Sequence, residues 1–303
     1  MKKNVLIIGF GSIGRRHAKI LKHNSQIKNI YILTKQNCKP FTKINNLKEI
    51  ISLDLDYIII SSQTSKHYNQ LLFLEKAFKK KIILVEKPLF TKNKKLIIKN
   101  NKVYVGYNMR FNPFIQLIKN KVKNKKIWSV NVFCGSYLPN WRENINYKYS
   151  SSAKKKNGGG VLLDLSHELD YIQWIFGKIK INHVVNEKIS NLKINTDDFF
   201  SLSGTAGTST RLQIDLNYFT KKTTRRIIID GENISINADL IEKNIDINEK
   251  KTNQKHLEKN FHRDFSYTQQ HKALLNNNFK NCCTYKEGAS TMQLIEKIRK
   301  FKR

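Results

Sequence analysis

The chain has 303 residues, which is enough for one large domain or two ordinary domains with separate apolar cores. No run of eighteen apolar residues occurs, and the N-terminus leads directly into a strand-like run. We therefore expect no membrane span, no signal peptide and a cytoplasmic protein. The four cysteines show no C-x-x-C spacing, so we expect free thiols and no metal site.

The charge is strongly positive, with 56 basic and 23 acidic residues and a formal net charge of +33. Nucleic-acid binding is not the interpretation we favour, because 46 of the basic residues are lysine and only ten are arginine, the residue that reads bases and phosphates best. The lysines are spread along the chain beside abundant Asn and Ile, which indicates a compositional bias. A positive field would still attract anionic cofactors and substrates.

The first third alternates strand and helix patterns, as a doubly wound parallel sheet does. The predicted strands are 5–8, 30–33, 57–60, 82–85 and 103–105, and the predicted helices are 13–21, 66–77 and a Lys-rich helix between the last two strands.

From about residue 125 the pattern changes to an α+β arrangement with a mostly antiparallel sheet. The predicted strands are 127–133, 179–185, 210–219, 225–229, 234–238 and 241–247, and the predicted helices are 158–176, 265–275 and 286–301, with an irregular polar stretch over 138–157. The fold class is thus α/β: a Rossmann domain over 1–111, and an open-faced sheet domain over 112–303 whose last helix is free to pack on the first domain.

A glycine-rich turn follows the first predicted strand and opens the first predicted helix. Gly9-x-Gly11-x-x-Gly14 allows a tight turn, a close approach of the backbone to a pyrophosphate and close packing of helix on strand. The helix N-terminus, with Ser12 and Ile13, favours negative charge. We therefore expect a bound dinucleotide.

The choice between NAD and NADP depends on the end of the second predicted strand, Leu33-Thr34-Lys35. An NAD enzyme usually carries an acidic residue there for the ribose hydroxyls. Thr34 and Lys35 are instead suited to a 2′-phosphate, which favours NADP slightly. The alternative is that both are ordinary loop residues of a lysine-rich protein.

The tripeptide Glu86-Lys87-Pro88 directly follows the apolar strand 82–85. Ligands of open α/β sheets bind at the carboxyl ends of the strands, where this lysine falls. An amine held there can act in proton transfer if its surroundings lower its pKa. The alternative is a surface lysine in a turn, which Lys87 would be if it stood alone.

A second dense motif runs from Gly158-Gly159-Gly160 to Asp164, His167 and Asp170. If residues 158–176 form one helix, Asp164 and His167 are i, i+3 neighbours on one face. A carboxylate so placed would fix the tautomer of the histidine and raise its basicity for acid–base catalysis. A structural histidine is the alternative.

These motifs together resemble the Gfo/Idh/MocA oxidoreductase family over essentially the whole chain. The resemblance implies a Rossmann domain followed by a substrate-binding sheet domain, and hydride transfer between a nicotinamide and a secondary alcohol or ketone of a sugar. One departure is that three positions, rather than the usual four, lead from Asp164 to His167. The matching segments are the glycine turn, Glu86-Lys87-Pro88, Gly106-Tyr107-Asn108-x-Arg110-Phe111-x-Pro113, and Gly158 to Asp170.

The resemblance also implies residue roles. Lys87 and His167 would be catalytic, with His167 as general acid/base and Asp164 binding substrate or orienting the histidine. Whether Lys87 or His167 moves the proton stays open. The cofactor would be contacted by Thr64, His67, Glu86 and Lys87 in addition to the glycine turn, Thr34 and Lys35.

The substrate interpretation rests on aromatic and arginine residues. Trp141 and Arg142 precede the three glycines, and aromatic faces suit sugar rings while arginine suits a carboxylate or phosphate. Packing at a domain junction is the alternative for the aromatic residues. Arg110 is a second candidate anion contact.

The stretch from Tyr137 to Tyr149, together with Leu163 to Glu168, resembles the family branch found in nonulosonic-acid and surface-polysaccharide sugar pathways. We expect a small-molecule sugar substrate and a homodimer or homotetramer. The alternative function is a non-catalytic, dinucleotide-binding regulator of the same fold.

Overall fold

The computed structural model describes residues 2–143, 145–249, 252–257 and 261–301. The chain divides into two compact units, and each is described by itself. The first unit comprises Met1–Phe111 and Arg263–Met292, and the second comprises Asn112–His262 and Gln293–Arg303. Residues 112–303 were all expected in the second domain, whereas Arg263–Met292, here called the returning segment, belongs to the first unit. Residues 302 and 303, at the end of the predicted second domain, lie outside the described residues.

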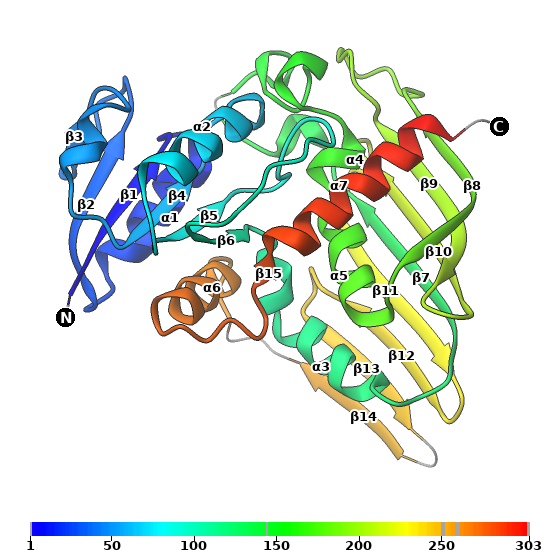
Figure 1. The fold of residues 1–303 in the computed structure, drawn as a ribbon. Coiled ribbons are helices and arrows are strands. Elements are labelled where there is room, and N and C mark those ends of the chain that lie inside the picture. Colours follow the sequence, from blue (N-terminus) through cyan, green and yellow to red (C-terminus); the bar gives the residue numbers. More distant parts are fainter. Residues whose placement is uncertain (1, 144, 250–251, 258–260, 302–303) are drawn as a thin grey trace. The chain divides into compact units, whose positions relative to one another are not determined.

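The first unit is built on a seven-stranded sheet in the order β15-β6-β5-β4-β1-β2-β3 (Figure 1). All neighbouring strands are parallel except the β15–β6 pair. The central strands β4 and β5 are buried at every residue, as expected for strands covered on both faces. The strands are β1 (Lys3–Ile8), β2 (Ile27–Leu33), β3 (Thr42–Ile44), β4 (Tyr57–Ile60), β5 (Ile82–Val85), β6 (Lys102–Val105) and β15 (Cys283–Thr284).

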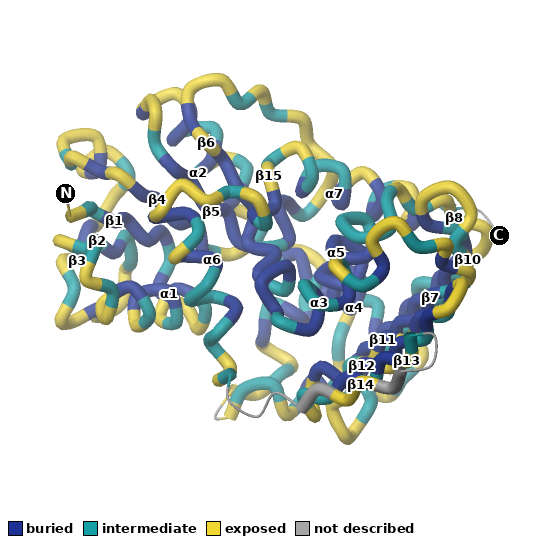
Figure 2. The backbone as a smooth tube through the Cα atoms, turned by 90° about the horizontal axis from the view of Figure 1, so that it is seen from below, coloured by how far each residue is buried: buried dark blue, intermediate teal, exposed yellow. Residues whose placement is uncertain are grey.

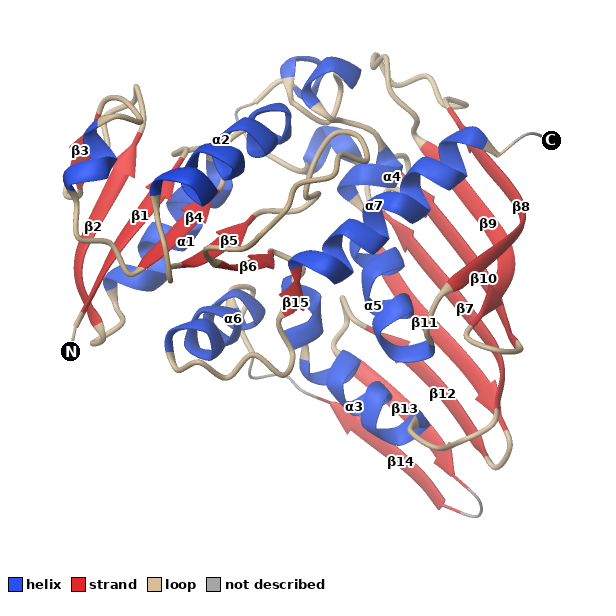
Figure 3. Cartoon of the chain, viewed as in Figure 1, coloured by secondary structure: helices blue, strands red, loops and turns tan. Residues whose placement is uncertain are grey.

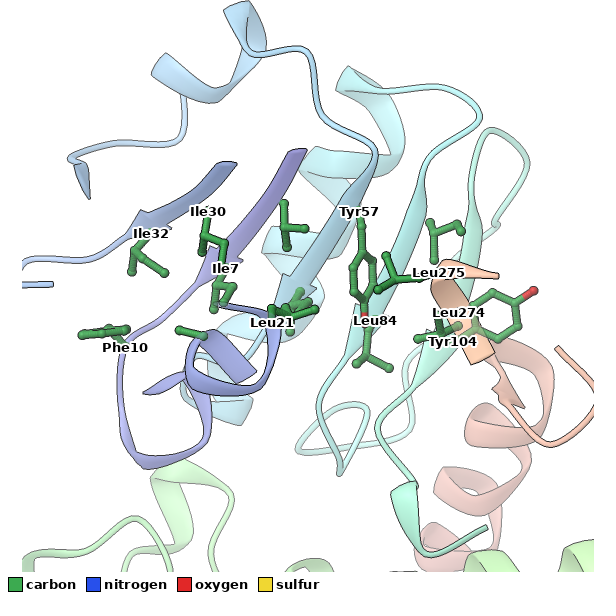
Figure 4. Close-up of a cluster of buried hydrophobic side chains, with 14 of the residues drawn as sticks. Ile7, Phe10, Leu21, Ile30, Ile32, Tyr57, Leu84, Tyr104, Leu274 and Leu275 are labelled. Atoms are coloured by element: carbon green, nitrogen blue, oxygen red, sulfur yellow. The ribbon is translucent and has the colours of Figure 1, made fainter. Parts of the chain in front are cut away.

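Three helices cover the two faces of this sheet. The helices α1 (Ser12–Lys22) and α6 (Phe265–Leu275) lie on one side of the strands and α2 (Thr64–Ala77) on the other (Figure 2). The face under α1 and α6 carries a hydrophobic cluster that includes Leu21, Tyr57 and Leu84. Leu274 and Leu275 of the returning segment belong to the same cluster (Figure 4). The returning segment therefore completes the core of the first unit.

The second unit contains an eight-stranded sheet in the order β14-β13-β12-β11-β7-β10-β9-β8 (Figure 3). Only the β7–β10 pair is parallel, so the predicted, mostly antiparallel sheet is confirmed. Helices α3 (Pro113–Val122), α4 (Val161–Asp164) and α5 (His167–Phe176) belong to this unit. The strands are β7 (Ile127–Gly135), β8 (Ile179–Glu187), β9 (Phe199–Ala206), β10 (Thr210–Asn217), β11 (Thr224–Gly231), β12 (Ile234–Asp239), β13 (Asn244–Glu249) and β14 (Thr252–Leu257).

Several elements differ from the sequence expectation. The predicted Lys-rich helix between β5 and β6 was wrong, because no helix lies between Val85 and Lys102. Instead the buried carboxylate of Glu75 accepts hydrogen bonds from the amides of Lys99 and Asn100 and so holds this segment in an irregular course. The strands β3, β9, β14 and β15 were not predicted. The last helix, α7 (Tyr285–Lys300), was predicted within one residue at each end.

No helix in the described ranges is long and apolar enough to cross a membrane.

Candidate functional site

The predicted cofactor residues gather at one edge of the first unit's sheet. Strands β5, β4, β1 and β2 are parallel neighbours, so their carboxyl ends lie side by side. These ends lead into Lys87, Thr64, the glycine turn and Thr34, respectively. From β1 the strand order runs through β2 to β3 on one side, and from β4 through β5 to β6 on the other side. Open α/β sheets bind ligands at this switch point between β1 and β4.

Each glycine of the glycine turn has different surroundings. Gly9 has a φ of +99°, and a Cβ there would lie 2.7 Å from the backbone of Ser62. A Cβ at Gly14 would lie 2.1 Å from the carbonyl oxygen of Gly9, so only glycine lets α1 pack this close to β1. Gly11, in contrast, faces open space, with no heavy atom within 4 Å of a Cβ built on it.

The first turn of α1 is suited to an anion. Gly11 is the N-cap residue and provides no side-chain cap, so the amides of Ser12 and Ile13 receive no side-chain acceptor from it. Ser12 and Gly11 are exposed, and α1 has no acidic residue in its first turn. A helix N-terminus with these features fits the pyrophosphate of a dinucleotide.

The loop after β2 is bonded to a cation of α1, Arg15, that no motif indicated. The guanidinium of Arg15 lies 4.4 Å from the centroid of the Phe10 ring and donates a 2.7 Å hydrogen bond to Oε1 of Gln36. Oγ1 of Thr34 accepts a hydrogen bond from the Gln36 amide, which closes the turn. Arg15 and Lys35 thus flank a turn in which residues 33–37 include no acid. No motif connected Arg15 to this loop, because only the fold brings the two together.

His67 joins the loops that follow β4 and β5. Its side chain is buried, with Nδ1 3.2 Å from the carbonyl oxygen of Leu89 and Nε2 3.1 Å from that of Ser62. Burial lowers its pKa, although the two carbonyls act in the opposite direction. Thr64 is the first residue of α2, directly after this loop. His67 therefore braces the sheet edge, and its predicted contact with the cofactor stays a prediction.

Lys87 is half-buried at the end of β5, before a cis peptide bond to Pro88. The preceding Glu86 is only 6% exposed, and its carboxylate lies 3.1 Å from Nε2 of His17 on α1. The backbone amide of Glu86 donates to the carbonyl oxygen of Ile60 at the end of β4. The direct cofactor contact expected of Glu86 stays a prediction, while its place in the interior of the unit is clear.

Arg110 is 2% exposed and lies in the first unit, where Nη1 is 2.7 Å from Oε1 of Glu287. Burial opposes ionisation of Glu287, but Arg110 and Thr284 outweigh it and lower the pKa of this carboxyl. This ion pair accounts for the burial of Arg110. Its predicted contact with a substrate anion stays a prediction.

In the second unit the turn after the three glycines is held by Asp197, a residue that no motif indicated. Its side chain accepts from the Leu162 amide at 2.9 Å and its carbonyl accepts from the Val161 amide at 3.0 Å. Gly160 has a φ of +117°, and a Cβ there would lie 2.3 Å from the Asp197 carboxylate. Burial raises the pKa of Asp197, which the Leu162 amide partly offsets. Asp197 thus caps the N-terminus of α4, the short helix that ends at Asp164.

Asp164 and His167 do not share one helix, contrary to prediction. Asp164 ends α4 and His167 begins α5, with Leu165 and Ser166 between them in a turn. His167 is 8% exposed. Asp164 accepts at Oδ2 a 2.5 Å hydrogen bond from the hydroxyl of Tyr218.

Trp141 packs edge-on against the Tyr218 ring at 5.2 Å between centroids, and its Nε1 donates to Oγ of Ser136. Trp141 and Asp164 are therefore brought together through Tyr218, which no motif had indicated because it lies 54 residues from Asp164. Arg142 follows Trp141 and is half-exposed. Aromatic surface next to a carboxylate is suited to a sugar ring.

We expect the Tyr218→Phe variant to lose about 1–3 kcal/mol of unfolding free energy, because a buried hydrogen bond to a charged group is removed. Urea titration followed by circular dichroism measures this loss. The matched control is Tyr149→Phe, since Tyr149 is 75% exposed and should change stability by less than about 0.5 kcal/mol. Equal effects of the two changes would contradict a structural bond between Tyr218 and Asp164.

The profile for the NAD-binding Rossmann fold of an oxidoreductase family matches residues 3–98, and that for the C-terminal alpha/beta domain of the same family matches residues 119–301. The chain belongs to the Gfo/Idh/MocA oxidoreductase family. The resemblance inferred from the motifs and the predicted fold class are thereby confirmed.

Individual members of the Gfo/Idh/MocA family share modest identity with this chain. The uncharacterized oxidoreductase YrbE of Bacillus subtilis is 28% identical over 189 residues, which is 56% of this chain and 53% of YrbE. The chain thus matches about half the length of the curated relatives it resembles.

Two solved structures share the fold. The WlbA dehydrogenase from Bordetella pertussis, in complex with NADH and UDP-GlcNAcA, has a TM-score of 0.77 and 16% identity, over 99% of this chain and 96% of WlbA. A super-repressor mutant of Gal80p from Saccharomyces cerevisiae has a TM-score of 0.83 and 14% identity, over 99% and 95%. At these identities the likeness is one of fold.

Proposed function

We propose that this protein is an NAD(P)-dependent oxidoreductase that transfers a hydride between a nicotinamide and a secondary alcohol or ketone of a sugar or sugar derivative. One observation carries the proposal: the loop of Thr34, the glycine turn, Thr64 and Lys87 follow the neighbouring parallel strands β2, β1, β4 and β5 at one carboxyl edge. This order matches an extended dinucleotide, with the adenosine at β2, the pyrophosphate at α1 and the nicotinamide toward β5.

The proposed residue roles follow from the chemistry of alcohol oxidation. A bound nicotinamide supplies the hydride acceptor or donor. Lys87, half-buried at the sheet edge, binds the reacting hydroxyl and is one candidate to take its proton. His167 at the start of α5 is the other candidate. Asp164 and Trp141, joined through Tyr218, bind the sugar.

We propose NADP as the preferred cofactor, because Arg15 and Lys35 flank the Thr34 turn and no acid is present there to bind the ribose hydroxyls. Fluorescence titration should show NADPH binding roughly tenfold or more tighter than NADH, a difference of about 1.4 kcal/mol. We expect Thr34→Asp to reverse this preference, since the new carboxylate repels the 2′-phosphate while still accepting the Gln36 amide.

The matched control for that substitution is Thr34→Asn, which keeps the acceptor for Gln36 and adds no charge. It should leave the preference for NADPH within about threefold of the unmodified protein. A wild-type protein that binds NADH tenfold tighter, or an Asn variant that behaves like the Asp variant, would contradict the NADP assignment.

For the substrate we propose a sugar or a nucleotide-linked sugar, because the net charge of +33 attracts anionic groups. The sugar nucleotide bound by WlbA, a protein of the same fold, supports this class. Nonulosonic-acid or surface-polysaccharide biosynthesis is the pathway we propose from the branch resemblance. We also propose a homodimer or homotetramer, which analytical ultracentrifugation would measure.

A non-catalytic, dinucleotide-binding regulator is the second candidate, favoured by the shared fold of Gal80p. The two functions differ in turnover. An enzyme should reduce NAD or NADP with at least one member of a panel of sugars and sugar nucleotides, whereas a regulator should bind the dinucleotide with no turnover across the panel.

A further inference from the structure

A chain of four buried polar side chains runs through the first unit and ends next to Lys87. The hydroxyl of Tyr57 lies 3.0 Å from Nδ1 of His271, Nε2 of His271 lies 2.9 Å from Nδ1 of His17, and Nε2 of His17 lies 3.1 Å from Oε1 of Glu86. All four residues are at most 6% exposed. They come from β4, α6, α1 and the end of β5.

For neutral His17 and His271 rings, the chemistry of the groups gives this chain one direction. An ionised carboxylate only accepts hydrogen bonds, so Nε2 of His17 must carry the hydrogen. In a neutral imidazole the other nitrogen is then an acceptor, which requires Nε2 of His271 to donate to it. Nδ1 of His271 in turn accepts from the hydroxyl of Tyr57.

The two inner groups of the chain, His271 and Tyr57, are uncharged at neutral pH. Burial and the neighbouring His17 lower the pKa of His271 well below its ordinary value, so this ring is neutral. Burial, together with Cys282 and Glu86, raises the pKa of Tyr57 well above its ordinary value, so its hydroxyl keeps its proton.

The far end of the chain fixes the backbone that carries Lys87. The carboxylate of Glu86 packs against Gly106, where a Cβ would lie 2.6 Å from Oε1, so a side chain there would displace it. The other oxygen lies 3.3 Å from the Lys87 amide nitrogen, which donates to it. A shift of the Glu86 side chain would therefore move the start of the Lys87 turn.

We propose that Tyr57, His271 and His17 form a one-directional hydrogen-bond chain that holds Glu86 and thereby positions Lys87 for reaction. The three are positioning residues, and this role rests on the function proposed above for Lys87. The chain also explains why the returning segment belongs to the first unit, since α6 supplies His271.

Nitrogen NMR of isotopically labelled protein tests the direction without any activity measurement. We expect both His17 and His271 to be neutral Nε2–H tautomers, with signals assigned by the His17→Phe and His271→Phe variants. In Glu86→Gln the amide oxygen can still accept from Nε2 of His17, so both rings should keep the Nε2–H tautomer. An Nδ1–H tautomer of either ring in the wild-type protein would overturn the chain.

Kinetics test the positioning role. We expect His17→Phe to lower kcat roughly 10- to 100-fold, as a misplacement of about 1 Å does, with the Kd for the nicotinamide cofactor changed less than about threefold. The matched control is His23→Phe, the same change at an exposed position that ends the same helix. Should His17→Phe not fold, His271→Gln takes its place with the same expected split.

A folded His17→Phe protein whose kcat stays within twofold of wild type would overturn the positioning role. The failure of the proposed function is distinguishable from this result. Wild-type protein that binds neither NADH nor NADPH would contradict the oxidoreductase itself, whereas intact binding with the wrong tautomers would contradict only the chain.

Discussion

Replacing Lys87 with alanine is expected to lower kcat/KM for the sugar substrate by roughly 10²- to 10⁴-fold, the range found when a positioned proton-transfer group is removed. Lys87 lies at the carboxyl end of β5, half-buried and on the same sheet edge as the glycine turn. Because its side chain is partly exposed, the free energy of unfolding should change by less than about 1 kcal/mol.

Steady-state kinetics on a sugar panel and urea unfolding measure the two effects of Lys87→Ala. The matched control is Lys92→Ala, an exposed lysine five positions further along the same loop, which should leave both quantities unchanged. Substitution of Lys87 by methionine, which keeps the length of the side chain but removes its charge, should behave like alanine. Turnover that survives Lys87→Ala would contradict the proposed mechanism.

The second prediction is that a substitution in the glycine turn, Gly11→Ala, weakens cofactor binding without destabilising the fold. In Gly11→Ala the new methyl group meets no protein atom within 4 Å, and the φ of −74° suits any residue. Stability should therefore stay within about 0.5 kcal/mol. The methyl group occupies the space where the pyrophosphate approaches the backbone, so we expect cofactor affinity to fall by at least roughly tenfold, about 1.4 kcal/mol.

Gly14→Ala is the contrasting variant. Its methyl group would lie 2.1 Å from the Gly9 carbonyl oxygen, a backbone atom that cannot move aside without shifting α1 from β1. We expect a loss of about 1–3 kcal/mol of unfolding free energy in addition to weaker cofactor binding. Isothermal titration calorimetry measures the cofactor affinity of both variants, and urea unfolding measures their unfolding free energy. Full cofactor affinity in Gly11→Ala would contradict the assignment of the turn to the pyrophosphate.

The sequence predicted most of the fold because the signals were local. Apolar runs bounded by polar residues located β1, β4 and β5, and the glycine spacing located the start of α1. The missed strand β9 shows the limit of such signals. Its inward positions are the large residues Phe200 and Leu202 in the first half and the small residues Gly204 and Ala206 in the second half. The apolar alternation is therefore weak in the second half of the strand. Pairing with β8 and β10 on both sides supplies what the pattern lacks.

The site was less predictable, because its supporting contacts join residues far apart in the sequence. Tyr218 reaches Asp164 across 54 positions, and His271 reaches His17 across 254. Neither contact leaves a trace in spacing or composition. The expected single helix from Gly158 to Phe176 also failed for a tertiary reason, because Asp197 caps α4 from outside and a turn at Leu165 and Ser166 starts α5 anew.

The discontinuous first unit has a consequence for synthesis. During translation its first 111 residues emerge well before α6, because the segment from Asn112 to His262 must be made in between. At about 5–20 residues per second, this segment of about 150 residues takes roughly 8–30 s. Throughout that interval Leu84 and Tyr57 lack Leu274 and Leu275, and the Glu86 carboxylate lacks the far half of its support. A nascent chain released early should therefore expose an apolar sheet face and be a target for chaperones.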